Sequence, residues 1–398
     1  MKIQRAYKYE LMPNGEAVCM FVRFAGAKRF VWNKVLRDYE KYPGYVKAAN
    51  LLPQWKVEFP WMREAHSQVL QQALKDLDRG WKNFFEKRAE RPVPKKKGKS
   101  IDSFRFPQGF KLEEGNNRIY LPKIGWVRYR NSRAMRGVAK NITISSSGNK
   151  WFASIQVEYE AEPPVPIEHN PVGIDLGIAR FASLSDGSHV DPLNALKKRQ
   201  YRLRRYQRMM ARKQKFSQNW MKAKAKVQAE YKRIGDARKD YLHKASTQIV
   251  KNHDLICIED LQVANMTKSA AGTAAAPGRN VKQKSGMNRS ILDQGWYSFR
   301  LMLEYKSAWA GGRVIAVPAM YTSQTCPECG YVSKLNRKTQ AEFLCVKCGY
   351  SANADYVGSR NILAAGLAVF EGSALDLACG GEVEVRLPMK QEPTEAAA

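Results

Sequence analysis

Hydrophobic and polar residues alternate over residues 3–11, which is typical of a strand with one buried face. The period then changes, because apolar residues recur every three or four positions over residues 16–42 and again over about 65–88. Such spacing places them along one side of an amphipathic helix. We interpret both stripes as parts of a hydrophobic core. The polar face of the second helix carries Gln71 and Lys75, which are candidates for contact with nucleic acid.

Beyond a basic linker at residues 92–100, the period of the pattern becomes two again. Short alternating segments separated by turns extend from about 101 to 160. Segments of this length and spacing predict an antiparallel sheet or a small barrel. We expect the strand at 3–11 to complete an N-terminal antiparallel β-barrel within residues 1–165, with the helices at about 14–98 as an inserted helical domain.

A proline-rich stretch at residues 162–166 predicts the boundary to a second domain, over 166–380. Short apolar strands alternate there with helices, a pattern typical of an α/β domain. The strands are predicted at 172–177, 181–184, 255–259 and 314–317, and the helices at about 290–309 and 354–367. A stretch rich in Ala, Gly, Ser and Lys at 264–287 predicts a flexible loop, and we expect the tail at 381–398 to be disordered.

One segment of this second domain is strongly basic. Residues 197–244 contain 18 Lys and Arg but three Asp and Glu, a surplus of 18 − 3 = 15 positive charges. Gly and Pro are nearly absent, so we predict a helical hairpin over about 191–250. A charge run is often a solvated face, but this imbalance is too one-sided for ion pairs along the helix to neutralise. The predicted nucleic-acid contacts are Arg202, Arg204, Arg205, Arg208, Arg212, Lys213 and Lys215.

Aromatic residues are interleaved with these basic ones. Aromatic rings in such a segment either stack on bases or pack one helix against the other. We expect most of them to pack the two helices of the hairpin together. They are Tyr201, Tyr206, Phe216, Trp220 and Tyr231.

The chain as a whole is also basic. Among 398 residues, 67 Lys and Arg exceed 37 Asp and Glu by 67 − 37 = 30. A charge of this size favours a polyanionic partner, and nucleic acid is the leading candidate. No apolar run approaches the roughly 18 residues that a membrane helix requires, and no secretory signal follows the N-terminus. We therefore expect a cytoplasmic protein with no membrane partner.

Four of the seven cysteines form two pairs, Cys326 with Cys329 and Cys345 with Cys348, and fifteen residues separate the pairs. Two residues between cysteines let both thiolates point at one tetrahedral ion, and the glycine after each pair eases the tight turn. We predict a structural zinc ribbon over about 321–350 that binds one Zn²⁺. The alternative is two pairs of free or redox-active thiols.

Three acidic residues occupy the ends of predicted elements. Asp175 lies in a strand between two glycines, Glu259 ends another apolar strand, and Asp355 opens the helix after the cysteine pairs. Carboxylates at the ends of buried strands repel one another unless a cation lies between them, and their oxygens are ligands that Mg²⁺ prefers. Three carboxylates can hold two Mg²⁺ about 3.5–4 Å apart for hydrolysis of a phosphodiester. Each acid alone is more often a cap or an ion-pair partner, but the three in a basic chain favour a metal-dependent nuclease.

The order of the elements favours the same interpretation. A strand with Asp175, a hairpin, a helical segment, a strand with Glu259, a helix, a strand and a helix with Asp355 fit a ribonuclease-H-like layout. Asp355 follows Cys348 by seven residues, and an extended chain of that length spans at most about 25 Å. We therefore expect the zinc ribbon beside the carboxylates, so that loss of zinc disturbs Asp355.

At these residues the sequence resembles TnpB, the protein of the insertion-sequence orfB class that is related to the type V CRISPR nucleases. The similarity extends over most of the chain, and the ordered set of acids and cysteine pairs is specific where each motif alone is not. One departure surrounds Asp355, where many relatives have Asp-Arg-Asp and this chain has Asn-Ala-Asp. The motifs are Gly-Ile-Asp-Leu-Gly at 173–177, Ile-Glu-Asp-Leu at 258–261, Thr-Cys-Pro-Glu-Cys-Gly at 325–330, Asn-Ala-Asp at 353–355 and Asn-Ile-Leu at 361–363, with further likeness at 30–33 and 81–85.

The resemblance implies a RuvC-like domain that cuts DNA, with Asp175, Glu259 and Asp355 as its catalytic, Mg²⁺-binding acids. It also implies a noncoding guide RNA made from the transposon end, which pairs with double-stranded target DNA beside a short adjacent motif. Gln71 and Lys75 are then candidates for reading that motif. The transposon's separate transposase is a further functional partner that the resemblance suggests.

Two other functions stay open at this point. A family member repurposed as an RNA-guided regulator binds DNA without cutting it, but such members usually lose one of the three acids, and all three are present here. A transposase or junction resolvase acts on DNA ends itself, but the residue arrangement typical of the partner transposase is not evident. An RNA-guided DNA endonuclease is therefore the favoured interpretation.

Overall fold

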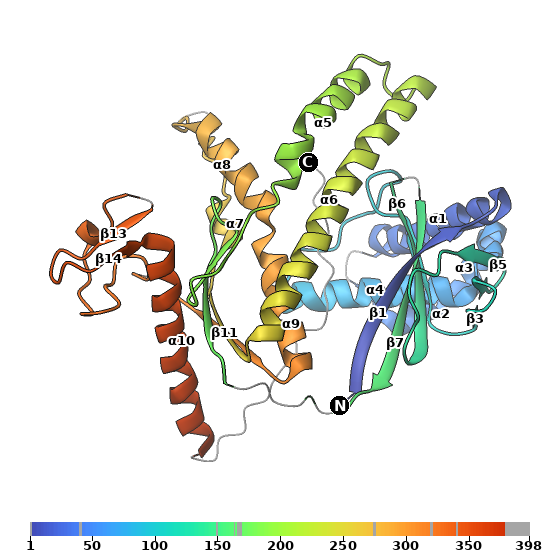
Figure 1. The fold of residues 1–398 in the computed structure, drawn as a ribbon. Coiled ribbons are helices and arrows are strands. Elements are labelled where there is room, and N and C mark those ends of the chain that lie inside the picture. Colours follow the sequence, from blue (N-terminus) through green and yellow to red (C-terminus); the bar gives the residue numbers. More distant parts are fainter. Residues whose placement is uncertain are drawn as a thin grey trace. The chain divides into compact units, whose positions relative to one another are not determined.

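A computed structural model describes residues 2–39, 42–148, 150–162, 164, 169–273, 276–318, 321–339 and 341–378, the last seven of these by their backbone alone. The chain divides into two compact units, whose main segments are Met1–Glu162 and Pro163–Gln391 (Figure 1). Each unit is described by itself. The tail at 381–398, which we predicted to be disordered, lies outside the described residues.

The first unit contains a seven-stranded antiparallel sheet in the order β2-β6-β7-β1-β5-β4-β3. The N-terminal strand is central to it, because Lys2 to Leu11 pair with Glu160 to Trp151 of β7 and the end of β1 pairs with β5. The expectation that the first strand joins the later ones is confirmed. The strands are β1 (Lys2–Met12), β2 (Ser103–Phe106), β3 (Lys111–Glu113), β4 (Arg118–Leu121), β5 (Gly125–Tyr129), β6 (Val138–Ser147) and β7 (Lys150–Glu160).

The predicted β-barrel is wrong, because the described residues form an open sheet with β2 and β3 at its two edges. The physical reason is that helices cover the apolar face which a barrel would turn inward. In α1 (Gly15–Asp38), Phe21 and Phe24 contact Phe104 of β2, with ring centroids 5.8 and 5.5 Å apart. All three rings are fully buried. The remaining helical elements of this unit are α2 (Tyr45–Asn50), α3 (Leu52–Glu58), η1 (Pro60–Glu64) and α4 (Ser67–Phe85).

The second unit is the mixed α/β domain that the alternation of strands and helices predicts. Its five-stranded sheet has the order β10-β9-β8-β11-β12, in which β8, β9 and β10 are antiparallel and β11 is parallel to both β8 and β12. The strands are β8 (Val172–Asp175), β9 (Ala182–Leu184), β10 (His189–Val190), β11 (Leu255–Glu259) and β12 (Arg313–Val317). A separate two-stranded sheet pairs β13 (Glu342–Leu344) with β14 (Ser351–Asn353), after the short helix η2 (Lys334–Asn336).

Two predictions for the middle of this unit need correction. The helix predicted at 290–309 is two helices, α8 (Val281–Gln294) and α9 (Trp296–Ala310), because Gly295 between them adopts a left-handed φ of 73° that ends a helix. The loop predicted at 264–287 is wrong at its end, since α8 already begins at Val281. A further helix, α7 (Val263–Met266), precedes it, and α10 (Ala354–Ala378) ends the described chain.

The basic segment folds into two long helices, α5 (Ala195–Ala211) and α6 (Gln218–Asn252), which lie side by side in Figure 1. A buried ion-pair group joins them. The carboxylate of Glu230, which is 0% exposed, accepts hydrogen bonds from Arg199 (2.8 Å) and Arg233 (3.1 Å). Apolar side chains of Ala195, Leu203, Val227 and Ile234 form the core between the helices.

The expectation that most aromatic residues pack these two helices together is wrong. Three of the five are exposed, because they lie on the outer surface of the hairpin or at its tip. Tyr206 does pack against the core between the helices, and Trp220 is half-buried. The exposed three are Tyr201, Phe216 and Tyr231.

Helix α10 lies against the sheet of the second unit at two glycines. A Cβ atom on Gly173 of β8 would lie 2.1 Å from the carbonyl oxygen of Ser359, and one on Gly366 would lie 2.1 Å from Sγ of Cys257 in β11. These contacts leave no room for side chains, so glycine at both positions lets the helix approach the two central strands. None of the helices in the described part of the chain combines the length and apolar content needed to cross a membrane.

Candidate functional site

Asp175 and Glu259 end neighbouring parallel strands. In the register of β8 and β11, Ile174 lies opposite Ile258, so the residue that follows each isoleucine is an acid at the same edge of the sheet. Asp355 lies in the first turn of α10, the helix that packs against β8. The three predicted acids therefore lie at the ends of two strands and at the start of one helix.

The charge environment of Asp175 indicates that the three acids share one neighbourhood. Burial and the negative charges of Glu259 and Asp355 together raise the pKa of Asp175 to about 7, while the positive charge of Arg337 acts in the opposite direction. Like charges disfavour ionisation only at short range. The structure thus places the acids where a cation would relieve their repulsion.

Glu259 has a partner that the sequence analysis missed. Burial raises the pKa of its carboxyl group, and a hydrogen bond from Oγ1 of Thr322 to Oε1 (2.8 Å) and the charge of Arg337 partly offset the effect of burial. Thr322 precedes the first cysteine pair and Arg337 lies between the two pairs. Their distance from Glu259 in sequence gave no signal of this contact, which depends on how the cysteine-containing segment docks.

A glycine in α10 lets this helix lie close to the carboxylate of Asp175. A Cβ atom on Gly358, one turn after Asp355, would lie 3.1 Å from Oδ2 of Asp175. The carboxylate of Asp175 therefore lies directly against the first turns of α10.

The side chain of Asn353 accepts a hydrogen bond from the backbone N–H of Asp355 (3.0 Å), which caps the helix at its start. Asn353, the first residue of the Asn-Ala-Asp stretch, thus positions Asp355 through its backbone.

The four predicted cysteines converge on one point. Their sulfur atoms all lie within 4.8 Å of one another, and Sγ of Cys326 and Cys348, like that of Cys329 and Cys345, are 3.6 Å apart. A tetrahedral zinc ion with Zn–S bonds of about 2.3 Å requires S···S distances of about 3.8 Å. The donor set therefore fits a zinc ion with all four positions occupied by protein.

Each cysteine pair is built the same way. The backbone N–H of Gly330 donates to the carbonyl of Cys326, and that of Gly349 donates to Cys345, both at 3.0 Å. Both glycines have left-handed φ angles, 70° and 75°. Burial opposes ionisation of the Cys345 thiol, but hydrogen bonds from the backbone N–H groups of Cys348 and Lys347 and from the thiols of Cys348 and Cys329 lower its pKa to about 6, while the pKa of Cys348 rises to about 12. A lowered pKa favours the thiolate that binds a metal.

The cysteine-containing segment is packed onto the helix that carries Asp355. Cys326 and Cys345 share a small core with Phe343 and with Ala354 and Val357 of α10. The side-chain amide of Asn361 in α10 donates to the carbonyls of Thr322 (2.7 Å) and Thr325 (2.8 Å). The same segment therefore touches both α10 and Glu259, which agrees with the expected proximity of the ribbon and the acids.

The carboxylates are arranged more openly than the cysteines. Within the described ranges, the cysteines are the only group of three or more His, Cys, Asp or Glu side chains whose ligand atoms approach so closely. All three carboxylates are half-buried, and the negative charges of Glu259 and Asp355 act on Asp175. Their donor set of carboxylate oxygens suits Mg²⁺.

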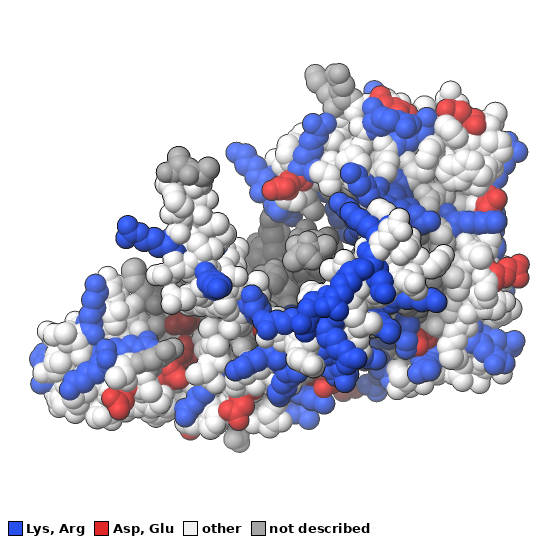
Figure 2. Space-filling model, turned by 90° about the horizontal axis from the view of Figure 1, so that it is seen from above, with Lys and Arg blue, Asp and Glu red and all other residues white. Residues whose placement is uncertain are grey.

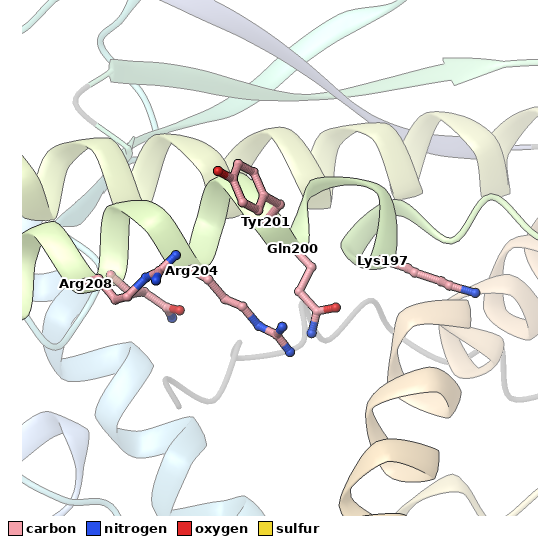
Figure 3. Close-up of a pocket in the computed structure, with 6 residues that line it drawn as sticks. Lys197, Gln200, Tyr201, Arg204 and Arg208 are labelled. Carbon is pink, nitrogen blue, oxygen red and sulfur yellow. The ribbon is translucent and has the colours of Figure 1, made fainter.

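The predicted nucleic-acid residues of the hairpin are all exposed: Arg202, Arg204, Arg205, Arg208, Arg212, Lys213 and Lys215. Arg204 and Arg208 line a groove of about 610 Å³ along α5, together with Lys197, Gln200, Tyr201 and Gln207 (Figure 3). These positions recur every three or four residues, so they form one stripe of the helix. In the amide orientation that satisfies its neighbours, Gln200 accepts hydrogen bonds from Arg204 (2.8 Å) and Arg289 of α8 (3.2 Å).

The two candidates in the first unit differ in their surroundings. Lys75 of α4 lines a second groove, where its Nζ lies 5.5 Å from the ring centroid of Tyr45. Asp78 shares that groove with three further basic residues, Lys47, Arg79 and Lys82. Gln71 is exposed one turn earlier on the same helix. A basic groove with an aromatic wall suits a polyanion.

Three family models match the chain. The OrfB_IS605 model, described as "Probable transposase", matches residues 154–270, and the model of the Cas12f1-like TNB domain matches 296–362. A helix-turn-helix model of the OrfB_IS605 group matches 1–42. In the structure, however, the described residues of that last range form the strand β1 and the single helix α1.

Two relatives cover nearly the whole chain. InsQ of Escherichia coli (strain K12), whose name proposes an RNA-guided DNA endonuclease, is 53% identical over 99% of this chain and 98% of its own length. A protein of Streptomyces pristinaespiralis with a name of the same kind is 32% identical over 100% of this chain and 98% of its own. A solved structure titled as the Cas12f1–sgRNA–target DNA complex has a similar fold, with a TM-score of 0.50 at 12% identity over 91% of this chain and 98% of that chain.

Fold and site together define a class of multidomain α/β proteins with a cysteine ribbon beside an acidic sheet edge. Identity of 53% over nearly the full length of both proteins decides the particular family within that class. The chain belongs to the TnpB family of transposon-encoded proteins, the OrfB_IS605 group.

Proposed function

We propose that this chain is an RNA-guided DNA endonuclease that hydrolyses target DNA with two Mg²⁺ ions. The observation that carries the proposal is the grouping of Asp175, Glu259 and Asp355, in which burial and the other two acids raise the pKa of Asp175 to about 7. A strand order with three antiparallel strands followed by two parallel ones supports a RuvC-like, ribonuclease-H-like domain. The names of the two relatives support the activity.

The three carboxylates would hold the Mg²⁺ ions. When bound, such ions activate a water molecule and stabilise the leaving oxygen of a phosphodiester. The chain itself positions the donors: Thr322 orients the carboxylate of Glu259 through its hydrogen bond. The positive charge of Arg337 acts on both Asp175 and Glu259 and lowers the pKa of each carboxyl group. We assign one structural Zn²⁺ to the four cysteines.

The partners proposed for this chain are a guide RNA made from the transposon end and double-stranded target DNA. The solved complex with a similar fold contains Cas12f1, a guide RNA and target DNA, which supports both classes of partner. The formal charge of +30 suits two polyanions. We propose that the first unit reads the short adjacent motif through Lys75 and Gln71, and that the separate transposase acts on the same transposon.

The test is cleavage by the protein purified with its co-expressed RNA. With Mg²⁺ and a matched duplex, we expect cuts by the unaltered protein and loss of cutting in Asp175→Ala and Glu259→Ala. Asp260→Asn is the matched control, because this neighbouring carboxylate pairs with Arg300 at the surface instead. Undiminished cutting in both alanine variants would remove the mechanism, and recovery of no discrete RNA would remove the guide.

A further inference from the structure

The turn between α5 and α6 carries an exposed aromatic pair. The side chain of Phe216 is 75% exposed, and its ring centroid lies 5.5 Å from that of Trp220 in the first turn of α6. Met221 beside them is also exposed. An aromatic ring with so little protein contact contributes almost nothing to the core, so its position calls for another explanation.

The backbone holds Phe216 in a conformation that bulky residues rarely adopt. Its φ is 71°, in the left-handed region. The next residue, Ser217, caps α6 by accepting a hydrogen bond from the N–H of Trp220 (3.2 Å), and its own N–H donates to the carbonyl of Gln214 (3.1 Å). Because the cap fixes the start of the helix, Phe216 projects from the turn instead of packing along α6. Strained residues of this kind concentrate at functional positions.

The surroundings of the pair are purely basic. Between residues 211 and 229 there are six Lys and Arg and no Asp or Glu. Nζ of Lys215 lies 5.4 Å from the centroid of Phe216, and Nζ of Lys224 lies 5.2 Å from that of Trp220. Figure 2 looks down on this tip and shows far more Lys and Arg than Asp and Glu on that face. The charge excludes a cationic partner and favours a polyanion.

The hairpin holds the tip at a distance from the sheet. The C-terminal part of α6 packs in the sheet core through Leu242, Ala245 and Ile249, whereas its N-terminal part contacts α5. At a rise of about 1.5 Å per residue, Phe216 lies roughly 39 Å along the helix from Leu242. The buried Glu230 group and the core between α5 and α6 stiffen this arm. The tip therefore reaches a partner far from the three acids.

We propose that Phe216, supported by Trp220, stacks on an unpaired base of the bound RNA while the neighbouring lysines bind its phosphates. The inference rests on the proposed function, since it takes RNA as the resident partner. Bases inside a duplex already stack on each other, so a protruding ring requires an unpaired nucleotide. The RNA is favoured over a displaced DNA strand because the tip is remote from the acids, where a DNA strand is cut.

The first experiment is ultraviolet cross-linking of the complex purified with its co-expressed RNA. Trypsin cleaves after Lys215 and Lys222, so Phe216 and Trp220 fall in one peptide of residues 216–222. We expect a ribonucleotide adduct on this peptide, at a single RNA position that is unpaired in chemical probing. Absence of the adduct, or an adduct that appears only after matched duplex DNA is added and carries a deoxynucleotide, overturns the proposal.

The second experiment separates stacking from charge. The probe is the single-stranded RNA segment identified by cross-linking, with 2-aminopurine at the cross-linked base. Phe216→Asn removes the ring but keeps a residue that tolerates the left-handed backbone, and Phe216→Trp restores a ring. We expect Phe216→Asn to weaken binding about tenfold and to abolish the fluorescence quenching without changing the salt dependence. Lys215→Gln should instead reduce the slope of log K against log salt by about 0.7 and keep the quenching.

The control variant is Met221→Ala, which removes an exposed apolar side chain without a ring from the same tip and should leave quenching unchanged. Equal effects of Phe216→Asn and Met221→Ala, or full quenching in Phe216→Asn, overturn the stacking role. Because none of these measurements uses cleavage, the result stays separate from the proposed nuclease function. A complex that cuts DNA but shows no adduct refutes the inference alone, and an adduct without cutting refutes the nuclease alone.

Discussion

The two candidate metal sites of the second unit are built in opposite ways. The four cysteines lie within 348 − 326 = 22 positions, and each pair is shaped by its own backbone hydrogen bonds. Asp175 and Asp355 are 355 − 175 = 180 positions apart, and their meeting depends on strand register and on the approach of α10. The comparison teaches that a local motif specifies its own ligand geometry, whereas a dispersed one needs the whole domain.

The two sites also differ in how they treat negative charge. Hydrogen bonds lower the pKa of the Cys345 thiol to about 6 against the effect of burial, whereas burial and the neighbouring thiols raise the pKa of Cys348 to about 12, so the cysteine site favours the anion at one of its sulfur atoms. Burial and like charges raise the pKa of Asp175 to about 7, so the acid site disfavours its anions. The four sulfur atoms lie within 4.8 Å of one another, and no other group of three or more such ligand atoms in the described part of the chain is as close. Each difference can be tested by disturbing one site and measuring the other.

The largest effect is expected from Asp355→Asn. We choose this acid because it lies closest to the ribbon in sequence. Cleavage should fall by about 10³-fold, because a carboxylate that holds a catalytic ion accounts for several kcal/mol of transition-state stabilisation. Zinc content should stay at about one ion per chain, and the RNA should stay bound. Cleavage assays, metal analysis and RNA recovery on one preparation check this. Loss of zinc in this variant would show that the two sites are not independent in this direction.

The converse change, Cys345→Ser, should affect both sites. Zinc binding contributes folding free energy to such a ribbon, so its loss should loosen the segment that carries Thr322 and Arg337. We expect zinc to be absent and cleavage to fall by about 100-fold, in the upper range for lost ligand-supporting contacts. Cys19→Ser, which changes an exposed free cysteine of the first unit, is the control. Full cleavage by a zinc-free protein would contradict the coupling.

A smaller effect is expected from the single hydrogen bond that links the ribbon to the acids. Thr322→Val removes the hydroxyl that donates to Glu259 and should raise the pKa of that carboxyl group further. Loss of such a supporting contact lowers cleavage by about tenfold. Thr322→Ser keeps the hydroxyl and should recover most of the activity at unchanged zinc content. If valine and serine behave alike, the hydrogen bond has no part in positioning Glu259.

The smallest effect concerns stability against pH without added Mg²⁺. The folded-state pKa of Asp175 is about 7, above its ordinary value of 3.8. At a pH between these two values, the folded protein therefore keeps a proton on this carboxyl group that the unfolded chain has lost. The free energy of unfolding should therefore fall as pH rises from 4 to 7, by at most about 4 kcal/mol. Asp175→Asn should remove this slope. Thermal melts at pH 5 and 8 should differ by on the order of 5 °C in the unaltered protein.

Added Mg²⁺ provides the matching control for that slope. A cation bound between the carboxylates stabilises their ionised form, so Mg²⁺ should raise the melting temperature at pH 8 more than at pH 5. The gain should vanish in Asp175→Asn and persist in Asp260→Asn. A melting temperature that responds equally at both pH values would mean that Mg²⁺ binds elsewhere.

Several features of the fold could be predicted because their causes are local. The cysteine spacing and the two glycines predict the ribbon, since ligands two residues apart need a particular turn. The charge surplus of residues 197–244 and their lack of Gly and Pro predict long helices. The barrel was wrong because Phe21 and Phe24 of a helix, and not further strands, bury Phe104. The break at Gly295 was also missed, because a glycine inside an apolar periodic stretch does not reveal its φ angle.

At the candidate site, residue types were predictable but contacts were not. The acids at strand ends were visible as a pattern, whereas Thr322, Arg337 and Gly358 became visible only through packing. The role of Thr322 depends on packing. Asn361 of α10 donates a hydrogen bond to its carbonyl group, and its own hydroxyl donates to Glu259. The exposed ring of Phe216 was likewise hidden, because an aromatic residue beside lysines is compatible with both a buried and an exposed position.

By itself, the sequence determined the basic character of this protein, the four-cysteine ligand set, the three acids and the alternation of strands with helices, because these follow from residue type and short-range spacing. The tertiary structure alone decided that helices cover the apolar face of the first sheet, that the ribbon supports Glu259, and that Phe216 faces solvent. Such outcomes depend on which surfaces meet across more than a hundred residues of chain. Periodicity records which side of an element is apolar, but it does not record the partner that buries it.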